Sequence, residues 1–246
     1  MKTLGELKFG RHRLRTPAVC GCVIGENLDE MREGVSRAVK QGADLIELRI
    51  DGLRGKIVWD ELLQKDLPTM LANHPEREGG SFKGGEEDRV GLLLEGIERG
   101  VSCVDIELST PKKLRDQVVS EAKKSGVTVL MSYHNISKTP PAESLMKVAK
   151  DLEGAGCDMA KIVTFAETPD DGLRMLDFLV RAQKEVAAPI IAFAMGDSGR
   201  ITRFVAPIFG SPIIYATAWK KTGPGQLDVA TMKKWASELM LKEVRG

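Results

Sequence analysis

The sequence predicts an α/β fold, a (β/α)8 TIM barrel that forms a single domain over residues 1–246, from three observations. Eight short apolar runs alternate with stretches of helical pattern, and successive runs start 23 to 33 residues apart. That spacing fits one strand, one helix and two connections per unit. The runs are apolar on both faces, as parallel strands covered on each side must be. No glycine-rich dinucleotide fingerprint follows the first run, which disfavours an open doubly wound sheet.

The predicted strands are residues 18–24, 44–50, 69–73, 102–108, 127–133, 158–165, 189–195 and 212–217. Two Thr-Pro pairs offer a helix N-cap followed by proline at the first helical position, Thr110-Pro111 and Thr168-Pro169. After the second pair, the spacing of Leu173, Leu176 and Val180 predicts one apolar helix face. Three glycines stand where a helix would end just before the next strand: Gly42, Gly100 and Gly126.

The residues before the first strand predict a short β-hairpin that closes the bottom of the barrel, because they alternate loosely on both sides of Gly10. Charges recur every few residues in this stretch. It therefore lacks the apolar central region of a secretory signal.

Composition excludes several classes of partner. Lys and Arg number 36 against 35 Asp and Glu, which argues against electrostatic binding of nucleic acid or of a membrane surface. No apolar run approaches the roughly 20 residues that span a bilayer. Four cysteines are too few for a disulfide scaffold at this length, so we expect reduced thiols in a cytoplasmic protein. Cys20 and Cys22 lack the second pair of a zinc site, and we expect no metal.

Charged residues inside apolar strands indicate where the chemistry lies, because an unpaired buried charge costs several kcal/mol. Glu47 and Arg49 share one strand face and suit a hydroxylated substrate, although a structural ion pair explains them equally well. Asp105 and Glu107 repeat this pattern on the fourth strand, either to orient a nearby cation or in a structural role.

Lys161 lies within the sixth strand, where desolvation and neighbouring cations would lower its pKa. A neutral amine there can attack a ketone and form an imine. The alternative is a lysine that reaches solvent or pairs with Glu107. His134 stands at the tip of the fifth strand, as a general acid/base or as a structural histidine.

The loops after the strands supply further candidates. Glu78 precedes a Gly-Gly pair in a charged loop and is placed to hold a histidine in one tautomer, although such charge runs are ordinarily solvated. Loops 196–199 and 223–226 follow the last two strands, where barrels bind phosphate or close a lid. Arg203 lies between these loops and suits a carboxylate.

Taken together and in order, these motifs resemble the type I 3-dehydroquinate dehydratase family. The matching stretches are Glu47-Leu48-Arg49, Glu78-Gly79-Gly80, Met131-Ser132-Tyr133-His134, Lys161-Ile162, Met195-Gly196 with Gly199 and Arg203, Phe209-Gly210-Ser211, and Pro224-Gly225-Gln226. They extend from the second predicted strand to the final loop, and several spaced motifs are more specific than any one.

The resemblance implies a shikimate-pathway lyase for aromatic amino acid and chorismate biosynthesis, a homodimer without metal or organic cofactor. Its small-molecule substrate would be 3-dehydroquinate, which loses water to give 3-dehydroshikimate. Lys161 would form a Schiff base with the ketone, His134 would act as base and then acid, and Glu78 would orient His134. By the same resemblance, the substrate-binding residues would be Glu47, Arg49, His74, Arg203, Thr222 and Gln226.

One position departs from the family pattern. Four residues before Glu78 the family carries an arginine that contacts substrate hydroxyls, and this chain has His74. That contact would be lost, replaced through water, or taken over by Arg77. Because Lys161 and His134 remain, we expect the departure to affect affinity more than chemistry.

Two other functions fit parts of the pattern. A class I aldolase or transaldolase-like barrel also uses a strand lysine, but it often acts on phosphorylated sugars. No phosphate cradle beyond residues 196–199 is evident. A non-catalytic, carboxylate-binding barrel is the second alternative. The presence of both Lys161 and His134 argues against it.

Overall fold

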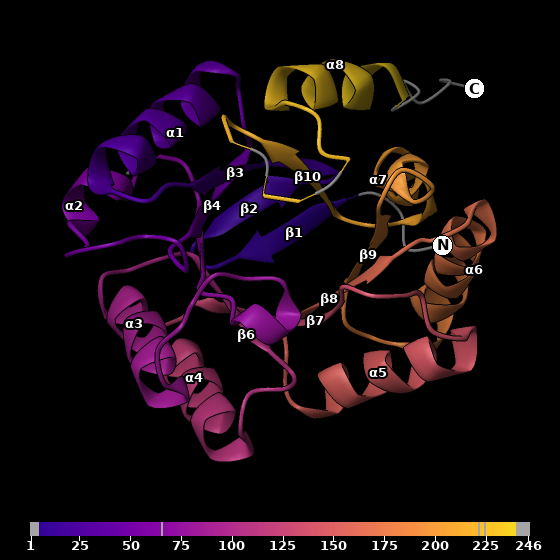
Figure 1. Cartoon of the computed structure of the whole chain (residues 1–246), viewed down its shortest axis with the longest axis horizontal. Coiled ribbons are helices and arrows are strands. Elements are labelled where there is room, and N and C mark those ends of the chain that lie inside the picture. Colours follow the sequence, from indigo (N-terminus) through magenta and orange to yellow (C-terminus); the bar gives the residue numbers. More distant parts are fainter. Residues whose placement is uncertain (1–4, 65, 221, 224, 240–246) are drawn as a thin grey trace.

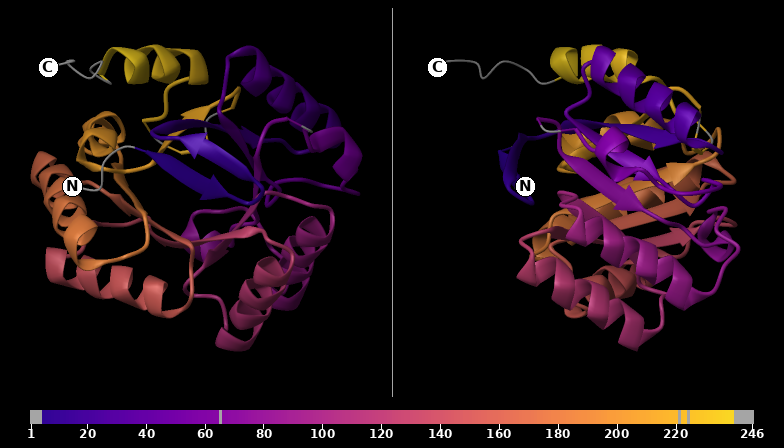
Figure 2. Two further views of the ribbon diagram at one scale, coloured as in Figure 1. Left: turned by 180° about the vertical axis from the view of Figure 1, so that it is seen from behind. Right: turned by 90° about the vertical axis from the view of Figure 1, so that its left-hand side faces the viewer.

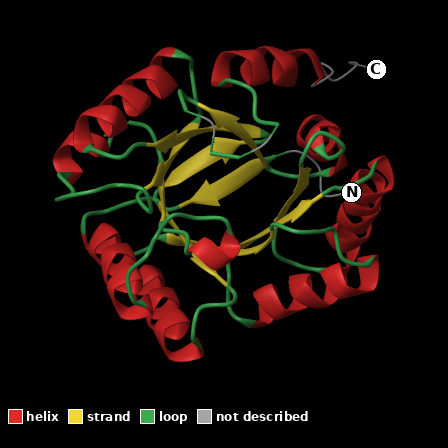
Figure 3. Cartoon of the chain, in the orientation of Figure 1, coloured by secondary structure: helices red, strands yellow, loops and turns green. Residues whose placement is uncertain are grey.

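A computed structural model describes residues 5–64, 66–220, 222–223 and 225–239. Eight parallel strands curl into one nearly closed barrel with the helices outside it, so the predicted fold is confirmed (Figures 1 and 3). The strands, which agree with the prediction to within two residues at each end, are β3 (Ala18–Ile24), β4 (Leu45–Arg49), β5 (Thr69–Ala72), β6 (Cys103–Glu107), β7 (Thr128–Asn135), β8 (Met159–Phe165), β9 (Ile190–Met195) and β10 (Ile213–Thr217). They follow one another round the sheet in chain order, with β10 paired to β3.

The helices follow the strands along the chain. They are α1 (Leu28–Lys40), α2 (Trp59–Leu62), α3 (Glu86–Glu98), α4 (Lys112–Lys124), α5 (Ala142–Gly154), α6 (Pro169–Glu185), α7 (Arg200–Val205) and α8 (Val229–Leu239), with 3₁₀ turns η1 (Glu76–Glu78) and η2 (Ala206–Phe209). Within the described residues, none of these helices has the length and apolar character needed to cross a bilayer.

The predicted helix ends hold at four of five places. Thr168 caps α6, and its backbone N–H donates to the carboxylate of Asp171. The three predicted glycines follow helix ends and have φ of +80°, +85° and +68°, the left-handed conformation that glycine adopts most easily: Gly42, Gly100 and Gly126. The exception is α4, which begins one residue late, because the Thr110 hydroxyl accepts a hydrogen bond from Arg89 instead of capping the helix.

The apolar face predicted for α6 is wrong. Leu173 is 64% exposed, and the buried face carries Gly172, Met175 and Leu179 instead. Glycine suits position 172, because a Cβ there would lie 3.3 Å from the Ser198 carbonyl oxygen, a tight contact. The helix therefore places Gly172 against the segment that contains Ser198.

The predicted hairpin is present as β1 (Glu6–Phe9) and β2 (His12–Arg15), and it lies across the N-terminal end of the barrel (Figure 2). Phe9 is fully buried among the residues that fill the barrel interior. The Gly10 N–H donates to the Thr128 hydroxyl at 2.7 Å. A Cβ at Gly10 would lie 2.6 Å from the Ser102 carbonyl oxygen, so glycine is required at this contact.

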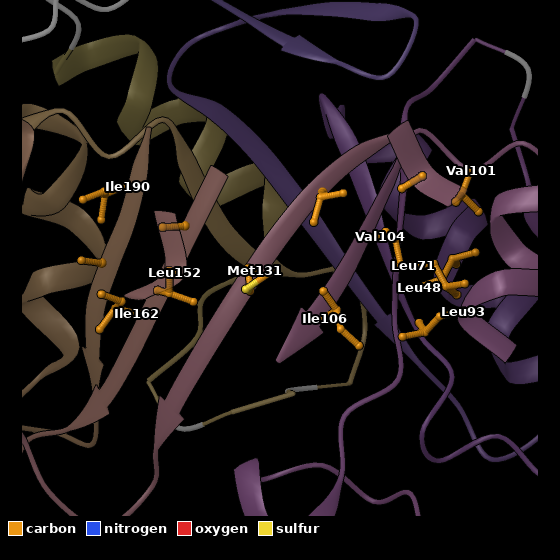
Figure 4. Close-up of a cluster of buried hydrophobic side chains, with 14 of the residues drawn as sticks. Leu48, Leu71, Leu93, Val101, Val104, Ile106, Met131, Leu152, Ile162 and Ile190 are labelled. Carbon is orange, nitrogen blue, oxygen red and sulfur yellow. The ribbon is translucent and has the colours of Figure 1, made fainter. Parts of the chain in front are cut away.

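Strand alternation sorts the interior into two layers. Outward side chains such as Leu48, Ile106 and Ile162 pack beneath the helices (Figure 4). Inward side chains are apolar near the strand beginnings, where Leu45, Met70, Cys103, Leu130 and Met159 share one cluster. Residues i and i+2 of a strand point the same way, and two residues further along the same faces β4, β6 and β8 carry charged side chains, Glu47, Asp105 and Lys161. The charged layer therefore lies at the C-terminal mouth of the barrel, on top of a dry apolar layer.

Candidate active site

A cavity of about 270 Å³ opens at this mouth. It brings together all nine residues that the sequence singles out: Glu47, Arg49, His74, Glu78, His134, Lys161, Arg203, Thr222 and Gln226. Its apolar wall includes Val163, Phe165 and Phe193, side chains that the sequence argument did not identify. Apolar walls with a few convergent polar groups are typical of small-molecule sites.

Lys161 points from β8 into the cavity and is almost fully buried. Its Nζ donates to Asp105 Oδ2 at 2.6 Å and lies 3.6 Å from Glu47 Oε1. Burial alone would lower the pKa of Lys161, but the two carboxylates outweigh it and raise that pKa. The predicted lowering of the pKa is therefore wrong for the substrate-free site, and so is the alternative pairing with Glu107. Lys161 rests as an ammonium ion.

His134 is held by Glu78 as predicted. Its Nδ1 lies 3.1 Å from Glu78 Oε2, and its backbone N–H donates to the same oxygen at 3.0 Å. The Ser109 hydroxyl donates to the other Glu78 oxygen. A carboxylate beside Nδ1 favours the tautomer that carries the hydrogen there. Nε2 is then left with a lone pair, as a general base requires.

The structural ion pair between Arg49 and Glu47, one of the two alternatives from the sequence, does not form. Arg49 Nε and Nη2 donate to the two Asp51 oxygens at 2.7 and 2.9 Å. Burial opposes the charge of Arg49, but Asp51 and Glu47 outweigh it and raise the pKa of the guanidinium. Asp51 thus holds Arg49 in place, while Glu47 lies beside Lys161.

Arg203 and the last loop form another part of the cavity lining. The Arg203 guanidinium lies 4.2 Å from the ring centroid of Phe193, and burial lowers its pKa to about 10. It therefore remains charged at neutral pH. The Thr222 backbone N–H donates to Gln226 Oε1 at 2.7 Å, and Gln226 Nε2 donates back to the Thr222 hydroxyl. Of the motif at this loop, Pro224 lies outside the described residues.

His74 sits between two carboxylates. Its Nδ1 lies 2.5 Å from Glu107 Oε1 and its Nε2 lies 3.6 Å from Asp105 Oδ2. Its ring meets that of His134 edge-on at a centroid distance of 4.9 Å. The imidazole therefore borders the cavity while both of its nitrogens face protein carboxylates. Arg77 ion-pairs with Glu86 at 2.8 Å and does not line the cavity, so it does not take over the expected arginine's place.

Comparisons with known proteins agree with this geometry. The family model described as type I 3-dehydroquinase matches residues 19–241. The chain belongs to the type I 3-dehydroquinase family. The 3-dehydroquinate dehydratase of Methanothermobacter thermautotrophicus is 36% identical over 225 residues, covering 90% of this chain and 97% of the relative.

Solved type I 3-dehydroquinases share the fold. A 3-dehydroquinate dehydratase from Geobacillus kaustophilus superposes with a TM-score of 0.86 at 27% identity, covering 95% of this chain and 96% of the other. The type I enzyme from Clostridium difficile, solved with covalently modified comenic acid, has a TM-score of 0.87 at 24% identity, covering 96% and 98%. The family prediction is confirmed, and the aldolase alternative falls away.

In this type I 3-dehydroquinase, Glu47, His74 and Asp105 bring possible metal-ligand atoms within 4.8 Å of one another. The Lys161 ammonium already occupies this cluster, hydrogen-bonded to Asp105 and close to Glu47. A divalent cation there would face a like charge at short range. We therefore assign the carboxylates to Lys161.

Three partners of the site residues in this 3-dehydroquinase lie outside the set of predicted site residues. Asp51 anchors Arg49, Asp105 binds Lys161, and the buried Arg89 donates to Glu107 at 2.6 Å. Asp105 and Glu107 carried a signal, as charges inside an apolar strand. Asp51 lies just past a strand and Arg89 on a helix, where charged residues are ordinary, so neither position stands out.

Proposed function

We propose that this chain, a lyase of the type I 3-dehydroquinase family, eliminates water from 3-dehydroquinate through an imine on Lys161 to give 3-dehydroshikimate. One observation carries the proposal. A buried lysine, a histidine held by a carboxylate and an arginine line the same cavity. The family, the named relatives and the structural neighbours support the dehydratase activity itself.

The reaction begins when Lys161 loses a proton and its amine attacks the C3 ketone. The carbinolamine then loses water to give a cationic imine, which acidifies the C2 hydrogens. His134 Nε2 removes one of them, and the resulting enamine expels the C1 hydroxyl. The imidazolium of His134 protonates that hydroxyl as it leaves as water. Hydrolysis of the product imine releases 3-dehydroshikimate and restores Lys161.

The other predicted residues anchor the substrate. Arg203 pairs with the substrate carboxylate, with help from Thr222 and Gln226. Arg49 and Glu47 hold the ring hydroxyls. Glu47 Oε1 is buried and has no hydrogen-bond partner within the described part of the chain, which suits an incoming hydroxyl. Holding the ketone beside Lys161 lowers the barrier by several kcal/mol, so these contacts serve rate as well as affinity.

The test is to incubate the protein with 3-dehydroquinate and to follow the ultraviolet absorbance of the conjugated enone product. The reaction is then repeated with borohydride. The mass of the intact protein is measured by mass spectrometry, and digestion locates any adduct in the chain. We expect rising absorbance and a reduced adduct on Lys161. Rising absorbance without an adduct would overturn the imine route, and neither signal would mean a non-catalytic binding protein. Turnover should withstand chelators; strong inhibition by them would contradict the absence of a metal.

Replacing Arg203 by glutamine is expected to raise KM by about 10- to 100-fold, because hydrogen bonds to charged groups contribute about 1.5–3 kcal/mol. The glutamine keeps polar atoms but loses the charge that the substrate carboxylate requires. Steady-state kinetics over a range of substrate concentrations that spans KM measure the effect. The Arg200→Gln variant is the matched control, because Arg200 does not line the cavity. An unchanged KM in Arg203→Gln would remove Arg203 from the carboxylate site.

The protein is further proposed to be a cytoplasmic homodimer. All four cysteines are free thiols, as a reducing compartment allows. Leu173 on α6 and Ile201 on α7 are exposed apolar side chains on neighbouring helices, suited to an interface (Figure 1). Sedimentation should give twice the 26.9 kDa mass of one chain. A monomeric wild type would refute the dimer.

A further inference from the structure

We propose that a buried chain of acid–base groups takes up the proton that Lys161 must lose before it attacks the ketone. The chain runs from Lys161 through Asp105 to His74, and it ends at Glu107. This inference rests on the proposed imine route and assigns His74 a role other than substrate binding.

The contacts form a continuous path. Lys161 Nζ donates to Asp105 Oδ2 at 2.6 Å. The same oxygen lies 3.6 Å from His74 Nε2, slightly beyond hydrogen-bond length, so a small shift of the imidazole or carboxylate completes the path. On the far side of the ring, His74 Nδ1 lies 2.5 Å from Glu107 Oε1. All four side chains are buried, with exposed fractions of 3% or less.

Glu107 is suited to store a proton. Burial raises its pKa to about 7, and the carboxylates of Asp105 and Glu78 act in the same direction. Arg89 opposes them, with its Nη1 donating to the second Glu107 oxygen at 2.6 Å. A carboxyl group whose pKa lies near the ambient pH both accepts and returns a proton readily.

His74 is suited to pass the proton on without holding charge. Burial lowers its pKa well below the usual value; Arg49, Lys161 and His134 act in the same direction, and Asp105 opposes them. A neutral imidazole takes a hydrogen on one nitrogen as it gives one from the other. In the resting state the hydrogen is on Nδ1, which donates to Glu107, and Nε2 offers its lone pair toward Asp105.

The proton balance is simple. Lys161 passes H⁺ to Asp105 Oδ2, which passes one to His74 Nε2, and His74 Nδ1 passes its own to Glu107 Oε1. The result is a neutral amine and a protonated Glu107, with no change in net charge inside the barrel. The amine attacks the ketone carbon, and a proton moves from nitrogen to oxygen to give the carbinolamine. The stored proton returns through His74 and Asp105 to the carbinolamine hydroxyl, which leaves as water when the C–O bond breaks, and the nitrogen becomes the iminium cation.

A separate store relieves His134 of one role. If His134 took the lysine proton, it would have to return that proton to the leaving water before its Nε2 could remove hydrogen from C2. With the proton on Glu107, His134 remains a base throughout imine formation. The iminium then restores a positive charge beside Asp105 and Glu47, where the ammonium had been.

The test is the rate of imine formation, measured by rapid mixing with 3-dehydroquinate and quenching with borohydride at set times, from pH 5.5 to 9. We expect the wild-type rate to fall on the acidic side with an apparent pKa near 7, because protonated Glu107 accepts no proton. Glu107→Gln and His74→Gln should each slow this step by about 10²-fold and remove that acidic limb. Their KM should change little.

Glu86→Gln is the matched control, because Glu86 pairs with the same Arg89 but lies outside the chain. It should keep the wild-type rate and pH profile. Circular dichroism checks that each variant folds, and if Glu107→Gln fails to fold, His74→Gln decides alone. Wild-type rates and profiles in the folded variants, or a raised KM with unchanged imine formation, would overturn the chain. Absence of any adduct in the wild type would instead refute the imine route itself.

Discussion

The Lys161→Met variant is expected to lose turnover by about 10⁴- to 10⁶-fold and to give no borohydride adduct. Methionine fills a similar volume but has no nucleophile, so the ketone is never converted into the iminium that acidifies C2. Product absorbance measures the loss of turnover, and intact-protein mass measures the loss of the adduct.

The same change leaves Asp105 and Glu47 buried without their cation, which costs about 3–5 kcal/mol when one partner of a buried pair is removed. Lys161→Arg is therefore the companion variant. Arginine keeps the positive charge and the stability, but its guanidinium does not deprotonate and forms no imine. Turnover above about one hundredth of the wild type in the folded arginine variant would exclude Lys161 as the nucleophile.

The His134→Gln variant is expected to lower kcat by about 10²- to 10⁴-fold while leaving the adduct on Lys161 detectable. Glutamine retains polar contacts at the tip of β7 but neither removes the C2 hydrogen nor protonates the leaving hydroxyl. Imine formation itself continues, because in our scheme Glu107 holds the lysine proton. Steady-state kinetics and borohydride trapping on the same samples separate the two steps.

His12→Gln is the control, since His12 lies on the hairpin at the opposite end of the barrel. It should show wild-type kinetics. If His134→Gln abolished the adduct as completely as Lys161→Met does, His134 would be required for imine formation, and the proposed separation of roles would fail.

The strands were predictable because burial on both faces leaves unbroken apolar runs, and a charge inside such a run is conspicuous. That reasoning found Lys161, Glu47 and Asp105. The reasoning did not predict which of these side chains contact one another. In register, Lys161 pairs with Ser132 and Ser132 pairs with Glu107, so a flat sheet would suggest Glu107 as the partner. The strands of a barrel tilt, and the tilt changes which side chains meet across its interior, here Asp105.

Helix rotation was less predictable than strand position. On α6, leucine spacing favours one face, but the face that turns inward carries Gly172, Met175 and Leu179. The sequence also did not predict the partner of Arg49. Asp51 lies two residues beyond Arg49, just past the end of β4, where no periodic pattern distinguishes it.

Ionic strength affects two charge interactions differently: the close ion pair above the apolar layer, and the attraction of substrate to the mouth of the barrel. Lys161 Nζ lies 2.6 Å from Asp105 Oδ2, far less than the screening length of salt water, so added salt leaves this attraction almost intact. The attraction between Arg203 and an anionic substrate in bulk water acts over longer distances. Salt at about 0.1 M largely screens it beyond about 10 Å. Salt thus slows capture of the substrate at the open rim, while the bond-making steps below it continue undisturbed.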